Sequence, residues 1–283
     1  LLVALYTLSD FGTPAIMQLE VFTQAIYVEY GAFRRGFAAL LSLQLVAVTL
    51  VVLAVESTIE ADDRAAYEGR GNRSSARIRL GRWTGPALAF CALVVGLALV
   101  LPLTVLGWWL LRGSAYSGFA FEWSFAANSV YASSLAALAC VAAAIPVAYL
   151  SARSDSRLAR LVERATYVGY AIPGIVVGLA LVSFGIRAVP GLYQTVPLLV
   201  FAYVVRFLPV AIGVVRSSVL QVDRALVEAA RTLGESPRGA FRRVVVPLIA
   251  PGAAAGGALV FLTAMKELPA TLLVSPTGFD TLV

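Results

Sequence analysis

Long apolar runs alternate with short polar, arginine-rich stretches along the whole chain. All but the first of these runs are near or above the ~20 residues that a helix needs to cross ~30 Å of hydrocarbon. Strands of alternating apolar and polar residues are absent from the pattern, so helices are the only plausible spans. The pattern predicts an all-α, polytopic membrane helical bundle with about seven transmembrane segments, at residues 1–17, 36–55, 84–111, 128–150, 166–186, 195–218 and 249–274.

Composition supports this interpretation and narrows the function. Of the 283 residues, 60% are hydrophobic and 13% are charged, against roughly 25% charged in a soluble domain. This balance excludes a soluble enzyme, a disordered chain and a disulfide scaffold. Histidine is absent, and the two cysteines, Cys91 and Cys140, lie inside apolar runs where we expect small core residues. We therefore expect no metal site.

The arginines predict the orientation of the helices. Sixteen lie in the stretches 56–83, 151–165 and 216–243, which fall on one side of an alternating topology, and four lie on the other side. This asymmetry places the three rich stretches in the cytoplasm. We therefore interpret the net charge of +6 as a topology signal, with a lipid bilayer and not nucleic acid as the partner.

A helix–turn–helix pattern occupies the cytoplasmic stretch 221–251. Asp223 is suited to N-cap a first helix, whose apolar face would hold Leu226, Ala229, Ala230 and Leu233. Gly234 stands where a helix ends, and Ser236 with Pro237 would start a second helix. Pro247 would stop or kink that helix as the next span begins.

The spacing within this stretch resembles the EAA loop of ABC importer permeases. Glu228-Ala229-Ala230 is followed after three residues by Gly234, and after nine more by the run Val244-Val245-Val246-Pro247. The family's pattern ends in Ile-x-Leu-Pro, so two positions differ by conservative changes to valine. We call residues 221–251 the EAA loop. The resemblance implies a type I ABC importer permease fold.

Two flanking stretches resemble the iron(III) branch of this family, which has two fused halves of six helices each. They are Tyr203–Pro209, and Lys266–Leu273 with the Ser275–Leu282 stretch after it. A weak repeat at an offset of 257 residues aligns Asp10 with Glu267. On this basis residues 1–55 would end the first half, 56–83 would form a cytoplasmic linker, and 84–283 would form the second half without its final helix.

The resemblance implies transport without bond chemistry in this chain. ATP and Mg²⁺ would bind to separate ATP-binding cassette subunits, in two copies by the family's pattern, and the chain itself would hold no cofactor. A periplasmic or extracellular protein would deliver iron(III), with thiamine, sulfate, molybdate and polyamine as alternative substrates. The chain would be a multi-pass protein of the bacterial inner membrane. We interpret it as an internal fragment, since it begins with Leu1 and ends in mid-pattern.

The resemblance also implies roles for individual residues. The ATPase would dock on Glu228, Ala229, Ala230, Leu233, Gly234 and Pro247. Ala229 and Leu233 would pack in a groove of the ATPase or against the second helix. Glu228 would tie the loop to the ATPase or to a neighbouring arginine.

Four charged residues within or beside the spans have two interpretations. Arg206 lies some ten residues into its span, where a charge costs about 2.5–3.5 kcal/mol on insertion scales. It would either line the translocation path or form an intramembrane ion pair with Glu267. Lys266 could mark the outer end of a tilted helix instead, and Asp10 would hold the place equivalent to Glu267 in the first half.

Two other classes of membrane protein remain as rivals. An ion-coupled secondary transporter also has broken helices and repeats, but it needs no EAA loop, and acids within the spans are almost absent here. A membrane enzyme would need a cluster of catalytic residues, which the spans lack. The chain also contains no phosphate-binding Gly-x-x-x-x-Gly-Lys-Ser/Thr motif, so it cannot be its own ATPase.

Overall fold

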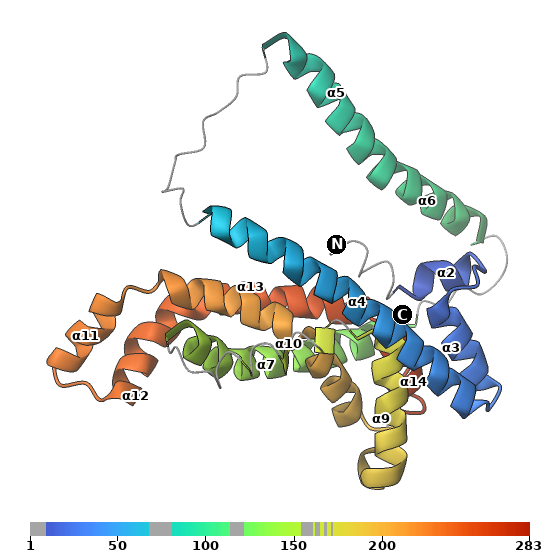
Figure 1. Cartoon of the computed structure of the whole chain (residues 1–283). Coiled ribbons are helices and arrows are strands. Elements are labelled where there is room, and N and C mark those ends of the chain that lie inside the picture. The colour runs from blue at the N-terminus through green and yellow to red at the C-terminus, as the bar shows by residue number, and fades with distance from the viewer. Residues whose placement is uncertain are drawn as a thin grey trace. The chain divides into compact units, whose positions relative to one another are not determined.

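The structure is a computed structural model that describes residues 10–67, 81–113, 122–153 and 172–283, together with residues 161, 165, 166, 169 and 170. Its regular elements in these ranges are all helical (Figure 1), in agreement with the predicted all-α class. They are α2 (Gly12–Ile16), α3 (Phe22–Gly31), α4 (Arg35–Tyr67), η1 (Gly81–Trp83), α5 (Thr84–Val95), η2 (Gly96–Val100), α6 (Leu101–Gly113), α7 (Trp123–Arg153), α9 (Gly174–Ala188), η3 (Pro190–Leu192), α10 (Val196–Gln221), α11 (Arg224–Thr232), α12 (Pro237–Ala240), η4 (Phe241–Val245), α13 (Val246–Met265) and α14 (Pro269–Val274).

Five helices in the described part of the chain are long and apolar enough to cross a membrane. They are Arg35–Val52, Gly81–Trp109, Trp123–Arg153, Val196–Gln221 and Pro237–Met265. A shorter apolar helix, Gly174–Ala188, accompanies them. Most of the predicted segments are therefore confirmed as apolar helices, and two of them differ in their limits.

A proline lies at the changed helix limit in both of these segments. In the predicted segment 166–186, helix α9 begins at Gly174, after Pro173, and has 15 residues, a length of about 22 Å at 1.5 Å per residue. The predicted segment 249–274 is two helices, because α13 ends at Met265 and Pro269 begins α14. A proline has no backbone N–H to donate and its ring crowds the carbonyl four residues earlier, so it favours the start of a helix over its interior, although Pro146 and Pro209 lie inside α7 and α10.

At the N-terminal side, the predicted segment 1–17 lies largely outside the described residues, and its last part contains only the five-residue helix α2. Helix α4 begins near the predicted start of the 36–55 span and continues to Tyr67, so the first part of the predicted linker is helical. The rest of that linker, up to residue 80, lies outside the described residues. The division of the chain into two permease halves remains a prediction.

The larger of two compact units comprises Leu1–Glu60 and Ser124–Val283. Its centre is a pair of neighbouring helices, α10 and α13, with α7, α9 and α14 packed around them (Figure 1). Helix α7 presents a stripe of small buried residues at every fourth position: Ala132, Ala136, Cys140, Ala144 and Ala148. Spacing by four places these side chains on one helix face, and their small size lets neighbouring helices approach closely.

Glycines of α13 make a second close-packed surface. A Cβ atom on Gly252 would overlap Ser218 of α10, and one on Gly256 would lie 3.4 Å from the Cβ of Val214. On Gly257 it would lie 3.2 Å from Val141 of α7. Small residues at helix contacts, such as these three glycines, let neighbouring helices approach closely.

The second unit, Ala61–Trp123, contains η1, α5, η2 and α6. None of the residues in its apolar span is buried within the chain. Cys91 is accordingly exposed, which corrects the expectation that both cysteines are core residues, whereas Cys140 is buried as expected. Near the end of α6, the guanidinium carbon of Arg112 lies 4.1 Å from the ring centroid of Trp108, a pairing typical of a membrane-interface anchor.

Candidate functional site: the EAA loop and a buried ion pair

The first arm of the EAA loop is α11, which follows directly after α10. Asp223 caps this helix, since its Oδ1 accepts a hydrogen bond of 2.9 Å from the backbone N–H of Ala225. An aspartate here also places negative charge at the positive end of the helix dipole. The predicted N-cap is confirmed.

Gly234 makes the turn between the two arms. Its φ angle is +94°, a backbone conformation that residues other than glycine rarely adopt. The Gly234 N–H donates to the Arg231 carbonyl and the Glu235 N–H donates to the Ala230 carbonyl, each at 3.1 Å. These two hydrogen bonds form a Schellman motif. The predicted glycine turn is confirmed, and its position is set by backbone bonding.

The second arm begins at Ser236, whose Oγ accepts a hydrogen bond of 3.0 Å from the Gly239 N–H. Pro237 occupies the first position of α12, as predicted. The arm then continues through the π-helical turn η4 into α13. Pro247 therefore neither stops nor breaks this helix, which corrects one of the two expectations for it. The wider π turn provides the room, because it moves the carbonyls away from the proline ring.

The apolar face predicted for α11 is exposed to solvent in this chain. Leu233 is 86% exposed and Leu226 is 50% exposed. Leu233 therefore does not pack against the second helix, which removes one of the two expectations for it. Exposed leucines on a helix with a strongly polar opposite face are typical of a surface that another protein covers.

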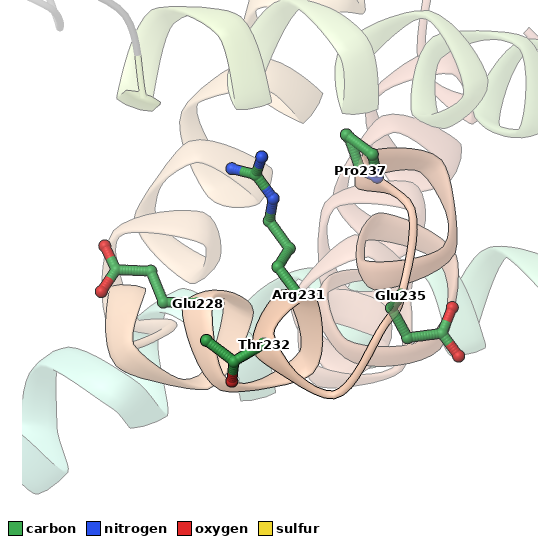
Figure 2. A pocket seen from close by; sticks show the side chains of 5 residues that line it. All are labelled: Glu228, Arg231, Thr232, Glu235 and Pro237. Atoms are coloured by element: carbon green, nitrogen blue, oxygen red, sulfur yellow. The ribbon is translucent and has the colours of Figure 1, made fainter.

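An open hollow of about 400 Å³ lies between the two arms. It is lined by Glu228, Arg231, Thr232, Glu235 and Pro237. Figure 2 shows the Arg231 side chain extending between the arms and the Glu228 carboxylate pointing away from it, whereas the Glu235 carboxylate lies against the second arm. Of the predicted docking residues, Glu228, Ala229, Leu233, Gly234 and Pro247 are exposed, and Ala230 is half-buried.

Deeper in the bundle, Arg206 of α10 forms an ion pair with Glu267, in the break between α13 and α14. We call Arg206 and Glu267 the buried ion pair, because they are 8% and 7% exposed. The Oε1 of Glu267 also accepts a hydrogen bond of 3.2 Å from the Ala270 N–H. Such partners offset the cost of removing charges from water.

Hydroxyl groups extend this polar cluster. The Tyr203 hydroxyl lies 2.8 Å from Thr271 Oγ1, which donates to the Glu267 backbone carbonyl. Gly174, the first residue of α9, lies so close that a Cβ atom there would overlap the Arg206 guanidinium. The sequence analysis missed Tyr203, Thr271 and Gly174 as members of the cluster. The signals that could have found Tyr203 and Thr271 are their spacings, three residues before Arg206 and four after Glu267, which share a helix face.

The other two predicted charges lie elsewhere. Lys266 is exposed at the C-cap of α13. Asp10 lies before α2, where its backbone carbonyl accepts a hydrogen bond of 2.8 Å from the Thr23 hydroxyl. The structure thus brings together Arg206 and Glu267, which was one of the two interpretations for the charges.

Comparison with known proteins identifies the family. Residues 144–282, which contain the EAA loop and the buried ion pair, match the family described as the binding-protein-dependent transport system inner membrane component. The chain is a permease of the ABC importers that depend on a binding protein. Because such permeases are multi-pass membrane proteins, the apolar helices of this permease span a membrane.

Relatives of the permease differ in what their names say they carry. The Fe(3+)-transport system permease protein FbpB 2 of Haemophilus influenzae is 33% identical over 288 residues, covering 100% of this chain and 57% of the relative. A probable molybdenum ABC transporter permease of Haloferax volcanii is 33% identical, covering 53% of this chain and 58% of the relative. The trehalose transport system permease protein SugB of Mycobacterium tuberculosis is 34% identical, covering 46% and 47%. The chain thus spans about half the length of these relatives.

Proposed function

We propose that the permease is the translocation subunit of an ATP-driven importer for iron(III). One observation carries the choice of substrate. The similarity to the Fe(3+)-transport relative extends over the whole chain, whereas the similarity to the molybdenum and trehalose relatives covers about half of it. Residues outside 144–282, the segment that matches the family, are therefore also similar to the iron relative, which favours iron(III) as the substrate.

The buried ion pair adds an argument against the anionic alternatives, molybdate and sulfate. Arg206 is the cation that could attract an anion within the spans, and its charge is already balanced by Glu267. Among the described residues, no three His, Cys, Asp or Glu side chains are close enough to hold a metal ion. Iron selection would therefore reside in a periplasmic binding protein that delivers the ion, and the permease would pass it on.

In this proposal the EAA loop receives the movement of the ATPase. Two ATP-binding cassette subunits would hold ATP and Mg²⁺, and one of them would cover the exposed apolar face of α11. Leu233 and Ala229 would enter a groove on that subunit, Ala230 would support them, and Glu228 would pair with a cation beside the groove. Gly234 sets the turn that makes α11 protrude, and Pro247 connects the loop to α13.

The test uses the complete permease reconstituted in liposomes with its ATPase and binding protein. Uptake of radioactive iron from the iron-loaded binding protein is measured with Mg-ATP, with and without excess molybdate. The proposal expects ATP-dependent iron uptake that molybdate leaves unchanged. Uptake of labelled molybdate in place of iron would contradict the choice of substrate but not the importer mechanism.

A pair of leucine variants tests the docking surface in the same system. Leu233→Asp places a charge on the exposed face of α11, and we expect the ATPase to bind about 30-fold more weakly, as for a central interface residue. Leu192→Asp in η3, which the arginine pattern places on the opposite side of the membrane, is the matched control and should leave binding unchanged. Equal binding of the ATPase by both variants would contradict docking on the EAA loop.

A further inference from the structure

The EAA loop has internal hydrogen bonds and an ion pair that hold its two arms in a fixed relation. Besides the Schellman motif at Gly234, the carboxylate of Glu235 pairs with the guanidinium of Arg243. Gly239 allows this pair to form, because a Cβ atom there would overlap the Glu235 carboxylate. These contacts oppose bending of the loop at its turn.

Helix α7 contacts the start of this loop. Arg153, the last residue of α7, donates a hydrogen bond of 2.6 Å to the Val222 carbonyl and a longer one of 3.4 Å to the Val219 carbonyl. Both carbonyls belong to the C-terminal turn of α10, where backbone acceptors lack helical partners and the helix dipole attracts a cation. Arg153 thus fixes α7 to the residue directly before the Asp223 cap.

Helix α7 also contacts the second arm of the loop, one turn earlier along its own length. The rings of Tyr149 and Phe241 lie in a T-shaped arrangement, with centroids 4.9 Å apart and planes at 74°. Phe241 is the first residue of η4, directly after α12. Such an edge-to-face pair favours one relative orientation of the two rings. One helix, distant in sequence, therefore contacts both the start and the second arm of the EAA loop.

We propose that α7 is the element that receives the movement of the EAA loop, with Arg153 and Tyr149 as its positioning residues. Covalent connection alone would let each arm of the loop move its own helix, α10 or α13. Since α7 contacts both the start and the second arm of the loop, a displacement of the loop carries α7, α10 and α13 together. The inference rests on the proposed function, in which an ATPase moves the loop.

The test follows the position of α7 directly, in the complete permease assembled with its ATPase in lipid nanodiscs. The native cysteines are replaced (Cys91→Ala, Cys140→Ala), and spin labels are attached at Leu138→Cys on α7 and Leu43→Cys on α4, two exposed sites. The distance between the labels is measured without nucleotide and with Mg-ATP and vanadate. We expect nucleotide to change this distance in the parent protein.

Removing both contacts, with Arg153→Ala and Tyr149→Ala, should reduce the fraction of molecules that change distance by about tenfold, an effect typical of losing a hydrogen bond to a charged group. Bound ATPase and ATP hydrolysis should persist. Arg153→Lys with Tyr149→Phe keeps the charge and the ring and should restore the change. Arg187→Ala, which removes an exposed arginine at the end of α9, is the matched control.

Three outcomes of this experiment would each overturn a different part of the proposal. An unaltered distance change in the double alanine variant would overturn the role of Arg153 and Tyr149. A parent protein that binds the ATPase but shows no change at α7 would overturn α7 as the receiving element. A parent protein that binds no ATPase would overturn the proposed function itself. If the double alanine variant does not fold, Arg153→Gln with Tyr149→Leu replaces it, with the same expected loss.

Discussion

At the scale of single residues, Gly234 is the position in the EAA loop where the backbone itself limits the choice of side chain. No atom lies within 4 Å of the place where a Cβ would stand, so space is not the constraint, but φ is +94°. A residue other than glycine there is strained by about 1–2 kcal/mol. Gly234→Ala should therefore loosen the Schellman motif. Hydrogen exchange of the Gly234 and Glu235 amides measures this, and we expect roughly tenfold faster exchange.

Gly234→Asn is the control for this prediction. Asparagine adopts positive φ more readily than alanine does, so its amides should exchange at a rate between those of the alanine variant and the parent protein. If the amides of the alanine and asparagine variants exchange equally fast, side-chain bulk and not backbone conformation would set the turn.

The buried ion pair leads to a second residue-scale prediction. Glu267→Gln leaves Arg206 charged and without its counter-ion, and should lower the free energy of unfolding by about 3 kcal/mol. Replacing both residues by apolar ones of similar size, Arg206→Met with Glu267→Leu, should recover most of this loss. Thermal unfolding in nanodiscs of the parent protein, Arg206→Met, Glu267→Leu and the double variant completes the double-mutant cycle.

Transport by the same variants distinguishes the two interpretations of Arg206. A structural pair predicts that the double apolar variant transports normally once it is stable. Loss of transport in a double variant of parent-like stability would instead place Arg206 on the translocation path.

At the scale of elements, the contact between α10 and α13 depends on Gly252. A Cβ atom there would lie 2.7 Å from the Cβ of Ser218 and would overlap the Ser218 hydroxyl. Gly252→Leu should force these helices apart and cost about 2 kcal/mol of stability, the scale of overpacking in a core. Ala258→Leu, on an exposed position of the same helix, is the matched control and should stay within about 0.5 kcal/mol. Equal stability of the two variants would show that the contact can relax.

The elements also show which parts of the structure can be predicted from sequence. Asp223, Gly234 and Ser236 act through the backbone of their own turn, so the pattern predicts their roles correctly. The break between α13 and α14 falls at residues 266–268, inside a stretch apolar enough to predict one span, since hydropathy reports length and not backbone bonding. The pairing of Arg206 with Glu267 depends on how distant helices pack, so the sequence offers it only as one of two alternatives.

The exposure of Leu233 shows the same limit for the site. Amphipathic spacing places Leu226 and Leu233 on one face of α11, and the structure has them there. The spacing does not say what covers that face. In this chain the second helix does not cover Leu233, which is why the docking role remains a proposal and needs the partner subunit for its test.

At the scale of the whole molecule, the arginine distribution predicts which ends of the helices face the cytoplasm. A single cysteine at Leu233, in a protein with Cys91 and Cys140 replaced by alanine, should react with a membrane-impermeant maleimide only from the cytoplasmic side. A cysteine at Leu192, between α9 and α10, should react only from the opposite side. Labelling of both positions from one side would contradict the predicted topology.

The buried ion pair also affects how the chain is made. Arg206 and Glu267 are separated by 61 residues (267 − 206), and either charge alone costs about 3 kcal/mol in the middle of a bilayer. At about 5–20 residues per second, the ribosome delivers Glu267 roughly 3–12 s after Arg206. Until then, α10 carries an unbalanced charge and is better held beside the translocon than released into lipid. Helices α10 and α13 should therefore leave the translocon together, as a hairpin that has already neutralised its own charge.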